Sequence, residues 1–161
     1  MNATKKPAAD LSLEELAVRL PPKGALMGLD LGTKTIGLSI SDGGRRIASP
    51  LRTITRTKFK ADAKALIGEA LEHDVAALVL GLPLNMNGSE GPRVQATRAF
   101  ARSLATLTDL PIVFWDERLS TAAVTRTLIA ADTSRKRRDE VVDKMAAAYI
   151  LQGVLDRMAK L

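Results

Sequence analysis

Two short apolar segments, VAALVLG at residues 75–81 and PIVFWDE at residues 111–117, constrain the fold of this chain most. Each is shorter than an ordinary helix and lacks the alternation of a strand with one wet face, so each predicts a strand buried on both faces. Apolar residues recur at helical spacing in the segments before them, at 58–74 and 93–108. Strands that alternate with helices predict a parallel pair with helices packed against the sheet.

The segment that precedes this region predicts three further strands. The runs LMGLDL, TIGLSIS and RIASPLRTI, between residues 26 and 54, are separated by the short polar turns GTK and DGG. Short turns between strand-like runs are typical of an antiparallel meander. The expected fold is therefore an α/β domain with a mixed five-stranded sheet, three strands antiparallel and two parallel, and helices on both faces.

The two ends of the chain are predicted separately. Residues 1–23 form an expected N-terminal extension, flexible in part, in which Ser12 and Glu15 have the spacing of a capping box for a short helix. Residues 24–161 form the expected domain. Two helices, at about 120–131 and 139–160, are predicted to end the chain, joined by a basic loop with the sequence SRKRRDE.

Composition excludes several classes of site and partner. The 161 residues include no Cys and a single His, His73, which excludes disulfides and zinc-thiolate sites and leaves little for a nucleophilic triad. No apolar run approaches the ~20 residues that span a bilayer, and the N-terminus has no apolar segment typical of a signal peptide. We therefore expect a cytoplasmic protein without a membrane partner. The net charge of +6 favours an anionic partner.

Three acidic positions are unusual for the elements that carry them. Asp30 lies inside a predicted strand, where Asp is depleted, although it could cap the following turn. Asp116 and Glu117 end a buried strand at the edge where open α/β sheets place their sites, although strand ends often carry solvated acids. Asp143 occupies the apolar stripe of the last predicted helix, although an acid in a first turn also stabilises the helix dipole.

Inward-facing carboxylates on two strands and a helix make a poor core and a good metal site. Mg²⁺ prefers carboxylate oxygens and water and takes the rest of its ligands from substrate phosphates. Two such ions ~3.5–4 Å apart can activate a water and stabilise the departing oxygen of a phosphodiester. The pattern therefore favours phosphodiester hydrolysis that depends on Mg²⁺ or Mn²⁺, most simply with two ions.

Four motifs, in this order, resemble the YqgF (RuvX) family of bacterial RNase H-like proteins: GLDLGTKTIGLSISD, GLPLNMNGSEG, DERLST and DKMAAAYILQGVLD. The resemblance runs from about residue 27 to 156. It implies an RNase H-like nuclease in which Asp30, Glu117 and Asp143 are the catalytic metal ligands, with Asp116 as an alternative to Glu117 because register at a strand end is uncertain.

The resemblance also suggests residues that contact nucleic acid. They lie in the first turn, the loop after the fourth strand, the end of the fifth strand and the basic run: Gly32, Thr33, Lys34, Asn85, Asn87, Gly88, Ser89, Arg93, Arg118, Arg135, Lys136, Arg137 and Arg138. Ser120 and Thr121 could orient the site, or Ser120 could only cap a helix. Polar loops and charge runs are also commonly just solvated.

The family points first to maturation of the 5′ end of the 16S ribosomal RNA precursor, and second to resolution of branched DNA at Holliday junctions. A monomer or a homodimer would serve, since a junction needs two symmetric cuts. Two other classes are weaker alternatives. One is a noncatalytic RNA-binding factor, and the other is an ATP-binding domain like those of actin-like ATPases, which need a second such domain. Because only 3% of the residues are aromatic, backbone and shape recognition are expected rather than extensive stacking on aromatic side chains.

Overall fold

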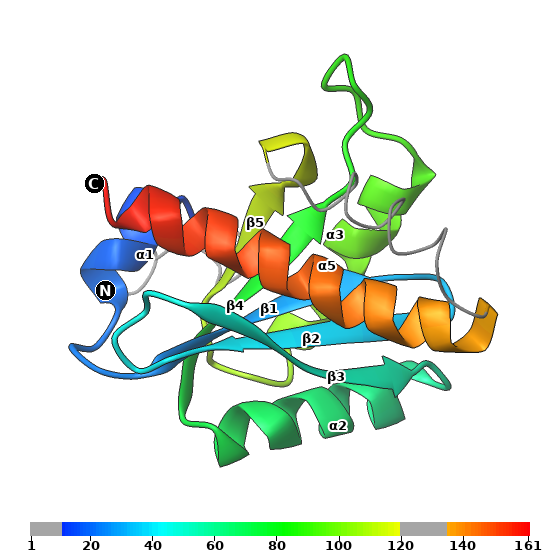
Figure 1. Cartoon of the computed structure of the whole chain (residues 1–161), viewed down its shortest axis with the longest axis horizontal. Coiled ribbons are helices and arrows are strands. Elements are labelled where there is room, and N and C mark those ends of the chain that lie inside the picture. The colour runs from blue at the N-terminus through cyan, green and yellow to red at the C-terminus, as the bar shows by residue number, and fades with distance from the viewer. Residues whose placement is uncertain (1–10, 120–134) are drawn as a thin grey trace.

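The computed structural model describes residues 11–119 and 135–161, with the side chains of residues 135–141 outside that description. Its centre is one five-stranded sheet with the strand order β3-β2-β1-β4-β5 (Figure 1). The strands are β1 (Ala25–Leu31), β2 (Thr35–Ser41), β3 (Ala48–Thr55), β4 (Val75–Leu82) and β5 (Ile112–Asp116). β1, β2 and β3 pair antiparallel, whereas β4 pairs parallel with both β1 and β5. The predicted mixed sheet is confirmed.

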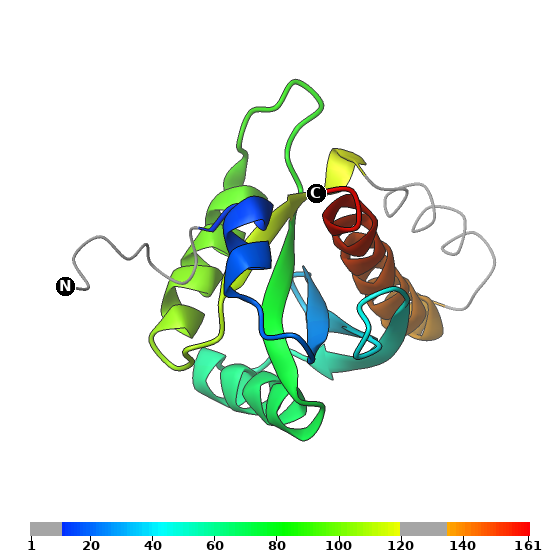
Figure 2. The same cartoon turned by 90° about the vertical axis from the view of Figure 1, so that its left-hand side faces the viewer.

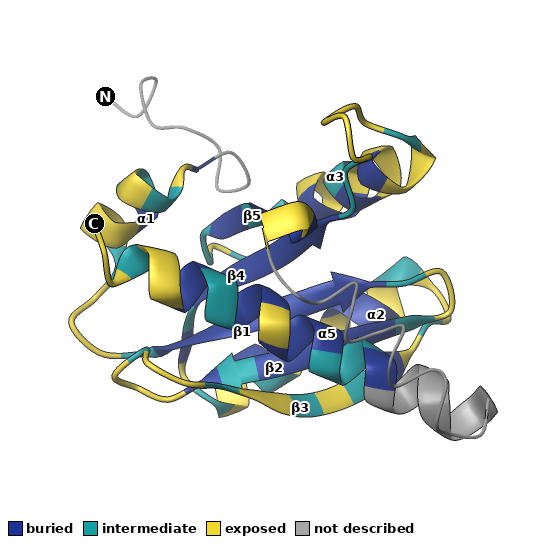
Figure 3. Ribbon diagram, turned by 45° about the horizontal axis from the view of Figure 1, so that its top comes forward, coloured by how far each residue is buried: buried dark blue, intermediate teal, exposed yellow. Residues whose placement is uncertain are grey.

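Helices cover both faces of this sheet, as Figure 2 shows. In the described residues they are α1 (Leu13–Arg19), α2 (Phe59–Glu72), α3 (Pro92–Ala105) and α5 (Arg135–Met158), with a 3₁₀ turn at Glu117–Leu119. α2 and α3 pack on one face around Met27 and Leu29, while α1 and α5 pack on the other around Leu26. This division follows the alternation of side chains along β1. β1 and β4 are buried almost throughout, as expected for central strands (Figure 3).

Small residues on β2 allow α5 to lie directly on the sheet. A Cβ at Gly37 would lie 2.1 Å from the backbone oxygen of Asp143, so any side chain there would push the helix away. Two residues later, Ser39 is buried, and its hydroxyl donates a hydrogen bond to the carbonyl of Ala147 (2.7 Å). The backbone of α5 is thus held against β2, and this contact sets the position of every side chain on the inner face of the helix.

The last helix begins at Arg135, four residues before its predicted start at residue 139. The basic residues 135–138 therefore belong to the helix backbone and do not form the expected loop. Arg and Lys are good helix formers, and residues 132–141 contain no Gly or Pro that would stop a helix from extending backwards. The helix predicted at about 120–131 lies outside the described residues.

The described part of the N-terminal segment packs on the domain. The predicted capping box is present, since the Ser12 hydroxyl accepts from the backbone N–H of Glu15. Leu16 is fully buried in the core beneath α5, and Leu11 forms a β-bridge with Val113. Residues 11–20 therefore extend one hydrophobic core of the domain. Within the described residues, no helix is both long enough and apolar enough to cross a bilayer.

Candidate functional site

A cavity of about 340 Å³ opens at the carboxyl end of β1. It is lined by Asp30, Gly32, Thr33, Lys34, Thr35, Arg93 and Asp143. Asp30 is only 4% exposed, and Asp143 is partly buried. Two of the three acids predicted from the sequence, 113 residues apart in the chain, are therefore brought to one cavity by the packing of α5 on β1 and β2.

Thr35, a residue that the sequence analysis did not select, holds Asp143 in this cavity. Its hydroxyl donates a hydrogen bond to Oδ2 of Asp143. The sequence carries a signal for this contact, because Thr35, Gly37, Ser39 and Ser41 place small residues at alternate positions of β2. Such a stripe indicates that a helix backbone approaches that face closely.

Glu117 lies on the same face of the sheet as Asp30. It is 8% exposed, and its Cγ lies 3.1 Å from the position that a Cβ of Gly81 would take. Leu29 pairs with Leu80, so Gly81 and Asp30 follow at the same level of two neighbouring strands about 4.8 Å apart. Glu117 thus reaches over β4 towards Asp30, and glycine at position 81 makes the space for it.

Asp116 lies on the opposite face and is already paired. Its carboxylate accepts hydrogen bonds from the Arg118 guanidinium, the shortest from Nη2 at 2.7 Å. This hydrogen bond is the main reason why the pKa of Asp116 is lowered from its usual value, and the same partner raises the pKa of Arg118. The two adjacent acids therefore have different surroundings. Glu117 lies on the face of the sheet that carries Asp30, and Asp116 forms an ion pair with Arg118 on the other face.

Two arginines hold the turn between β1 and β2. Arg56 donates from Nη1 to the carbonyl of Gly32 (2.6 Å), and Arg93 donates from Nη2 to the carbonyl of Leu31 (3.3 Å). Arg56 also lies 4.0 Å from the buried carboxylate of Asp62. Arg56 was not selected from the sequence, because nothing local shows that it reaches back 24 residues. The two side chains fix the turn that carries Thr33 and Lys34 along the cavity wall.

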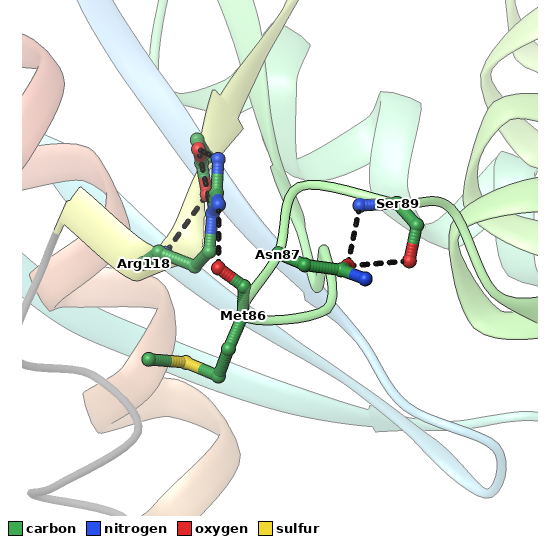
Figure 4. Close-up of polar contacts among 5 residues, drawn as sticks. Met86, Asn87, Ser89 and Arg118 are labelled. Carbon is green, nitrogen blue, oxygen red and sulfur yellow. Dashed lines mark hydrogen bonds and ion pairs between the residues drawn. The ribbon is translucent and has the colours of Figure 1, made fainter.

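The loop after β4 carries four of the predicted nucleic-acid contacts, and most of its polar side chains contact one another. Asn87 Oδ1 accepts from both the backbone N–H and the hydroxyl of Ser89 (Figure 4). Asn85 donates to the same hydroxyl. Arg118 donates to the carbonyl of Met86 at 3.1 Å. These side chains shape and anchor the loop, which leaves the outer surface of the loop for any ligand.

Other predicted site residues lie outside the described part of the structure. Ser120 and Thr121 are not described, and of Arg135, Lys136, Arg137 and Arg138 only the helical backbone is. Their roles in binding stay predictions.

A bound metal ion requires its ligand atoms to lie close to one another. Within residues 11–119 and 142–161, one group of three His, Asp or Glu has all its ligand atoms within 4.8 Å of one another: Glu69, Glu72 and His73, at the end of α2. Oxygens that share one Mg²⁺ lie within about 4.2 Å, since each is 2.0–2.1 Å from the ion. A single ion would therefore reach Asp30, Glu117 and Asp143 together only after their side chains move closer.

The donor set nevertheless fits hard divalent cations. It consists of carboxylate oxygens from β1, from the turn after β5 and from α5, on one face of the sheet. Lys34 and Arg93 line the same cavity and add positive charge that a phosphate would neutralise. Carboxylates and cations that converge on one cavity can bind a metal ion together with a phosphodiester.

Comparisons with known proteins identify the family of this chain. The model of the RuvX family, described as Holliday junction resolvase, matches residues 24–157. A relative from Methylocella silvestris is 64% identical over 151 residues, covering 94% of both chains, and one from Beijerinckia indica is 66% identical, covering 92% of this chain and 90% of its own. Both carry the name "Putative pre-16S rRNA nuclease". Among solved structures, RuvC of Thermus thermophilus, determined in complex with a Holliday junction, is 11% identical with a TM-score of 0.53 and covers 84% of this chain and 96% of its own. That likeness shows a shared RNase H-like fold.

Proposed function

The chain belongs to the RuvX family, and on that premise we propose that it is a divalent-metal-dependent nuclease that matures the 5′ end of precursor 16S ribosomal RNA. One observation carries the proposal: Asp30 and Asp143 line one cavity with Lys34 and Arg93, and Glu117 lies on the same face of the sheet. The names of the relatives from Methylocella and Beijerinckia support the choice of substrate. A ribosomal RNA substrate would place the activity in the cytoplasm.

Asp30, Glu117 and Asp143 would hold Mg²⁺ or Mn²⁺, and their spread over the face favours two ions over one. The bound ions supply the activation of a water and the neutralisation of charge that phosphodiester hydrolysis requires. Side chains of the protein orient the metal ligands, support the turn beside them and bind the phosphate. Thr35 orients the carboxylate of Asp143, while Arg56 and Arg93 hold the turn in place. Lys34 and the remaining N–H groups of Arg93 are placed to bind the phosphate.

A second candidate function is the resolution of branched DNA, which the description of the matched family favours. The chemistry at the phosphorus would be the same, and only the shape of the bound nucleic acid would differ. Two symmetric cuts at a junction would require a homodimer, whereas one cut in an RNA leader requires a single copy.

One experiment separates these functions. Purified protein is incubated with Mg²⁺, with Mn²⁺ or with EDTA, and with two labelled substrates, a precursor 16S RNA leader and a four-way DNA junction. We expect metal-dependent cleavage of the RNA that disappears in Asp30→Asn, the control for contaminating nucleases. Paired cuts in the junction alone would support the resolvase. Binding of RNA without cleavage, retained after all three acids are replaced, would overturn both in favour of a binding factor.

A further inference from the structure

The loop at residues 83–91 is held rigidly by its own polar groups. Besides the side-chain contacts of Asn85, Asn87 and Ser89, two backbone bonds close it, from Asn85 N to the Ser89 carbonyl (3.0 Å) and from Gly88 N to the Asn85 carbonyl (2.8 Å). Gly88 adopts φ +86°, a left-handed conformation that favours glycine. The shape of the loop is therefore set before any ligand binds.

The loop is also anchored at both edges of the candidate site. Arg118, held by Asp116 one residue from Glu117, donates to the carbonyl of Met86 (Figure 4). At the other end, Arg93 donates to the carbonyl of Leu31, next to Asp30. The loop therefore spans the rim of the site from the strand that bears Asp30 to the turn that bears Glu117.

This rigid loop presents an apolar side chain to solvent. Met86 is 88% exposed, the most exposed large apolar side chain in the described part of the chain. Isolated exposed apolar residues are common on protein surfaces and usually need no explanation. Here, however, the backbone of the exposed residue is held by Arg118, the residue that follows Glu117 in the chain, and its neighbours in the loop are Asn, Gly, Ser and Glu. A flexible, polarizable thioether is thus carried by a loop whose backbone is held by the residue that follows Glu117.

The turn between β1 and β2 and the loop at 83–91 offer no aromatic side chain on which a base could stack. Phe59, Phe100 and Phe114 pack in the core beneath α2 and α3, and Trp115 is buried beneath α5. The fifth aromatic residue, Tyr149, lies on α5. Of the loop's side chains, Met86 is the large apolar one exposed for contact with the face of a base.

We propose that Met86 is a wedge that enters the base stack of the bound nucleic acid beside the cleaved phosphate. The inference rests on the proposed nuclease function and adds a substrate class: nucleic acid with an interrupted stack, as at a branch point or where a duplex meets a single strand. Proteins insert apolar side chains, Met among them, between base steps that unstack at low cost. In a continuous duplex the inserted side chain must first unstack a complete base step, and the free energy required weakens binding. Polar contacts to the backbone do not make this distinction.

The test measures unstacking directly, without cleavage. The full chain is bound in Ca²⁺ to an RNA duplex with a two-nucleotide bulge flanked by 2-aminopurine, to the same duplex fully paired, and to a four-way DNA junction labelled at the branch. For the wild-type chain we expect 2-aminopurine fluorescence to rise on binding at the bulge or the branch. We expect Met86→Ser to abolish the rise and to weaken binding of the interrupted substrate about tenfold, with little change for the paired duplex.

Two variants control the test. Met86→Leu keeps an apolar side chain of similar volume and is expected to keep the fluorescence rise. Leu71→Ser removes another exposed apolar side chain, 74% exposed on α2 on the opposite face, and is expected to change nothing. An unchanged fluorescence rise and unchanged preference in Met86→Ser would overturn the wedge. A rise that depends on Met86 in a protein that cleaves neither substrate would overturn the nuclease function and leave the wedge standing.

Discussion

The acids on the two faces of the sheet have different neighbours. On the face covered by α2 and α3, each of two acids lies beside an arginine. The carboxylate of Asp62 lies 4.0 Å from the guanidinium of Arg56, and that of Asp116 lies 2.7 Å from the guanidinium of Arg118. On the α5 side, Asp30 and Asp143 line one cavity, and Glu117 lies on the same face of the sheet. Asp30 and Asp62 are almost equally buried, at 4% and 3% exposed. The exposed fraction of a carboxylate therefore does not identify an acid of the candidate site. The presence of other carboxylates nearby does.

This comparison has a physical meaning. A carboxylate beside an arginine stabilises the fold, because the pair satisfies both charges. Carboxylates that line one cavity repel one another, and a bound divalent cation would reduce that repulsion. Functional sites commonly reduce stability in this way, so removal of a site acid can stabilise the fold while it abolishes activity.

The largest expected effect distinguishes the two adjacent acids after β5. Glu117→Gln removes an acid that faces Asp30, and we expect kcat/KM for RNA cleavage to fall roughly 10²–10⁴-fold, as for Asp30→Asn and Asp143→Asn. Asp116→Asn removes the partner of Arg118 and is expected to cost less than about tenfold. Single-turnover cleavage with matched protein concentrations measures both variants. Full activity in Glu117→Gln together with inactivity in Asp116→Asn would reverse the assignment.

A smaller effect, on stability, separates Asp62 from Asp30. Asp62 Oδ1 accepts from the backbone N–H of Thr57 (3.0 Å), so Asp62→Ala removes the acceptor of that donor and the carboxylate beside the Arg56 guanidinium. We expect the free energy of unfolding to fall by about 1–3 kcal/mol, which lowers Tm by about 3–10 °C. Asp62→Asn, which keeps an acceptor oxygen, should lose less.

The matched measurement is the Tm of Asp30→Asn in EDTA, by circular dichroism or calorimetry. Because this change relieves repulsion among the site acids, we expect Tm to stay the same or to rise. An equal loss of Tm in Asp30→Asn and Asp62→Ala would contradict the distinction between the two faces.

The smallest expected effect is the pH dependence of the Asp116–Arg118 pair. Because the arginine lowers the pKa of Asp116 in the folded chain, the stability from this pair is fully present above the unfolded pKa, near 3.8. It is lost as the pH falls through the lower folded value. The Tm of the wild type should exceed that of Asp116→Asn by a constant, small amount above about pH 5, and the difference should vanish in stronger acid. A difference that grows as the pH falls would contradict the sign.

Much of the fold could be predicted from the sequence, and so could part of the site. The strands, the helices at 59–72 and 92–105, and the capping box of Ser12 depend on local periodicity and short-range hydrogen bonds. Alternation along β5 accounts for the opposite faces of Asp116 and Glu117, although the sequence left the choice between these two acids open. The start of α5 was predicted four residues too late, because residues 135–138 form a basic run that is also compatible with a loop, although they contain no Gly or Pro that would stop a helix.

The sequence by itself determined the mixed sheet, and it indicated that acids on two strands and a helix form a site. The tertiary structure alone decided which groups surround those acids: Thr35 on Asp143, Arg56 on the turn beside Asp30, Gly81 beneath Glu117, and Arg118 under the loop that carries Met86. The reason is the separation along the chain of the residues that interact. Periodicity and capping act over a few residues, whereas these contacts depend on the register of β1 against β4 and on the seat of α5 against β2, which join residues up to 108 positions apart.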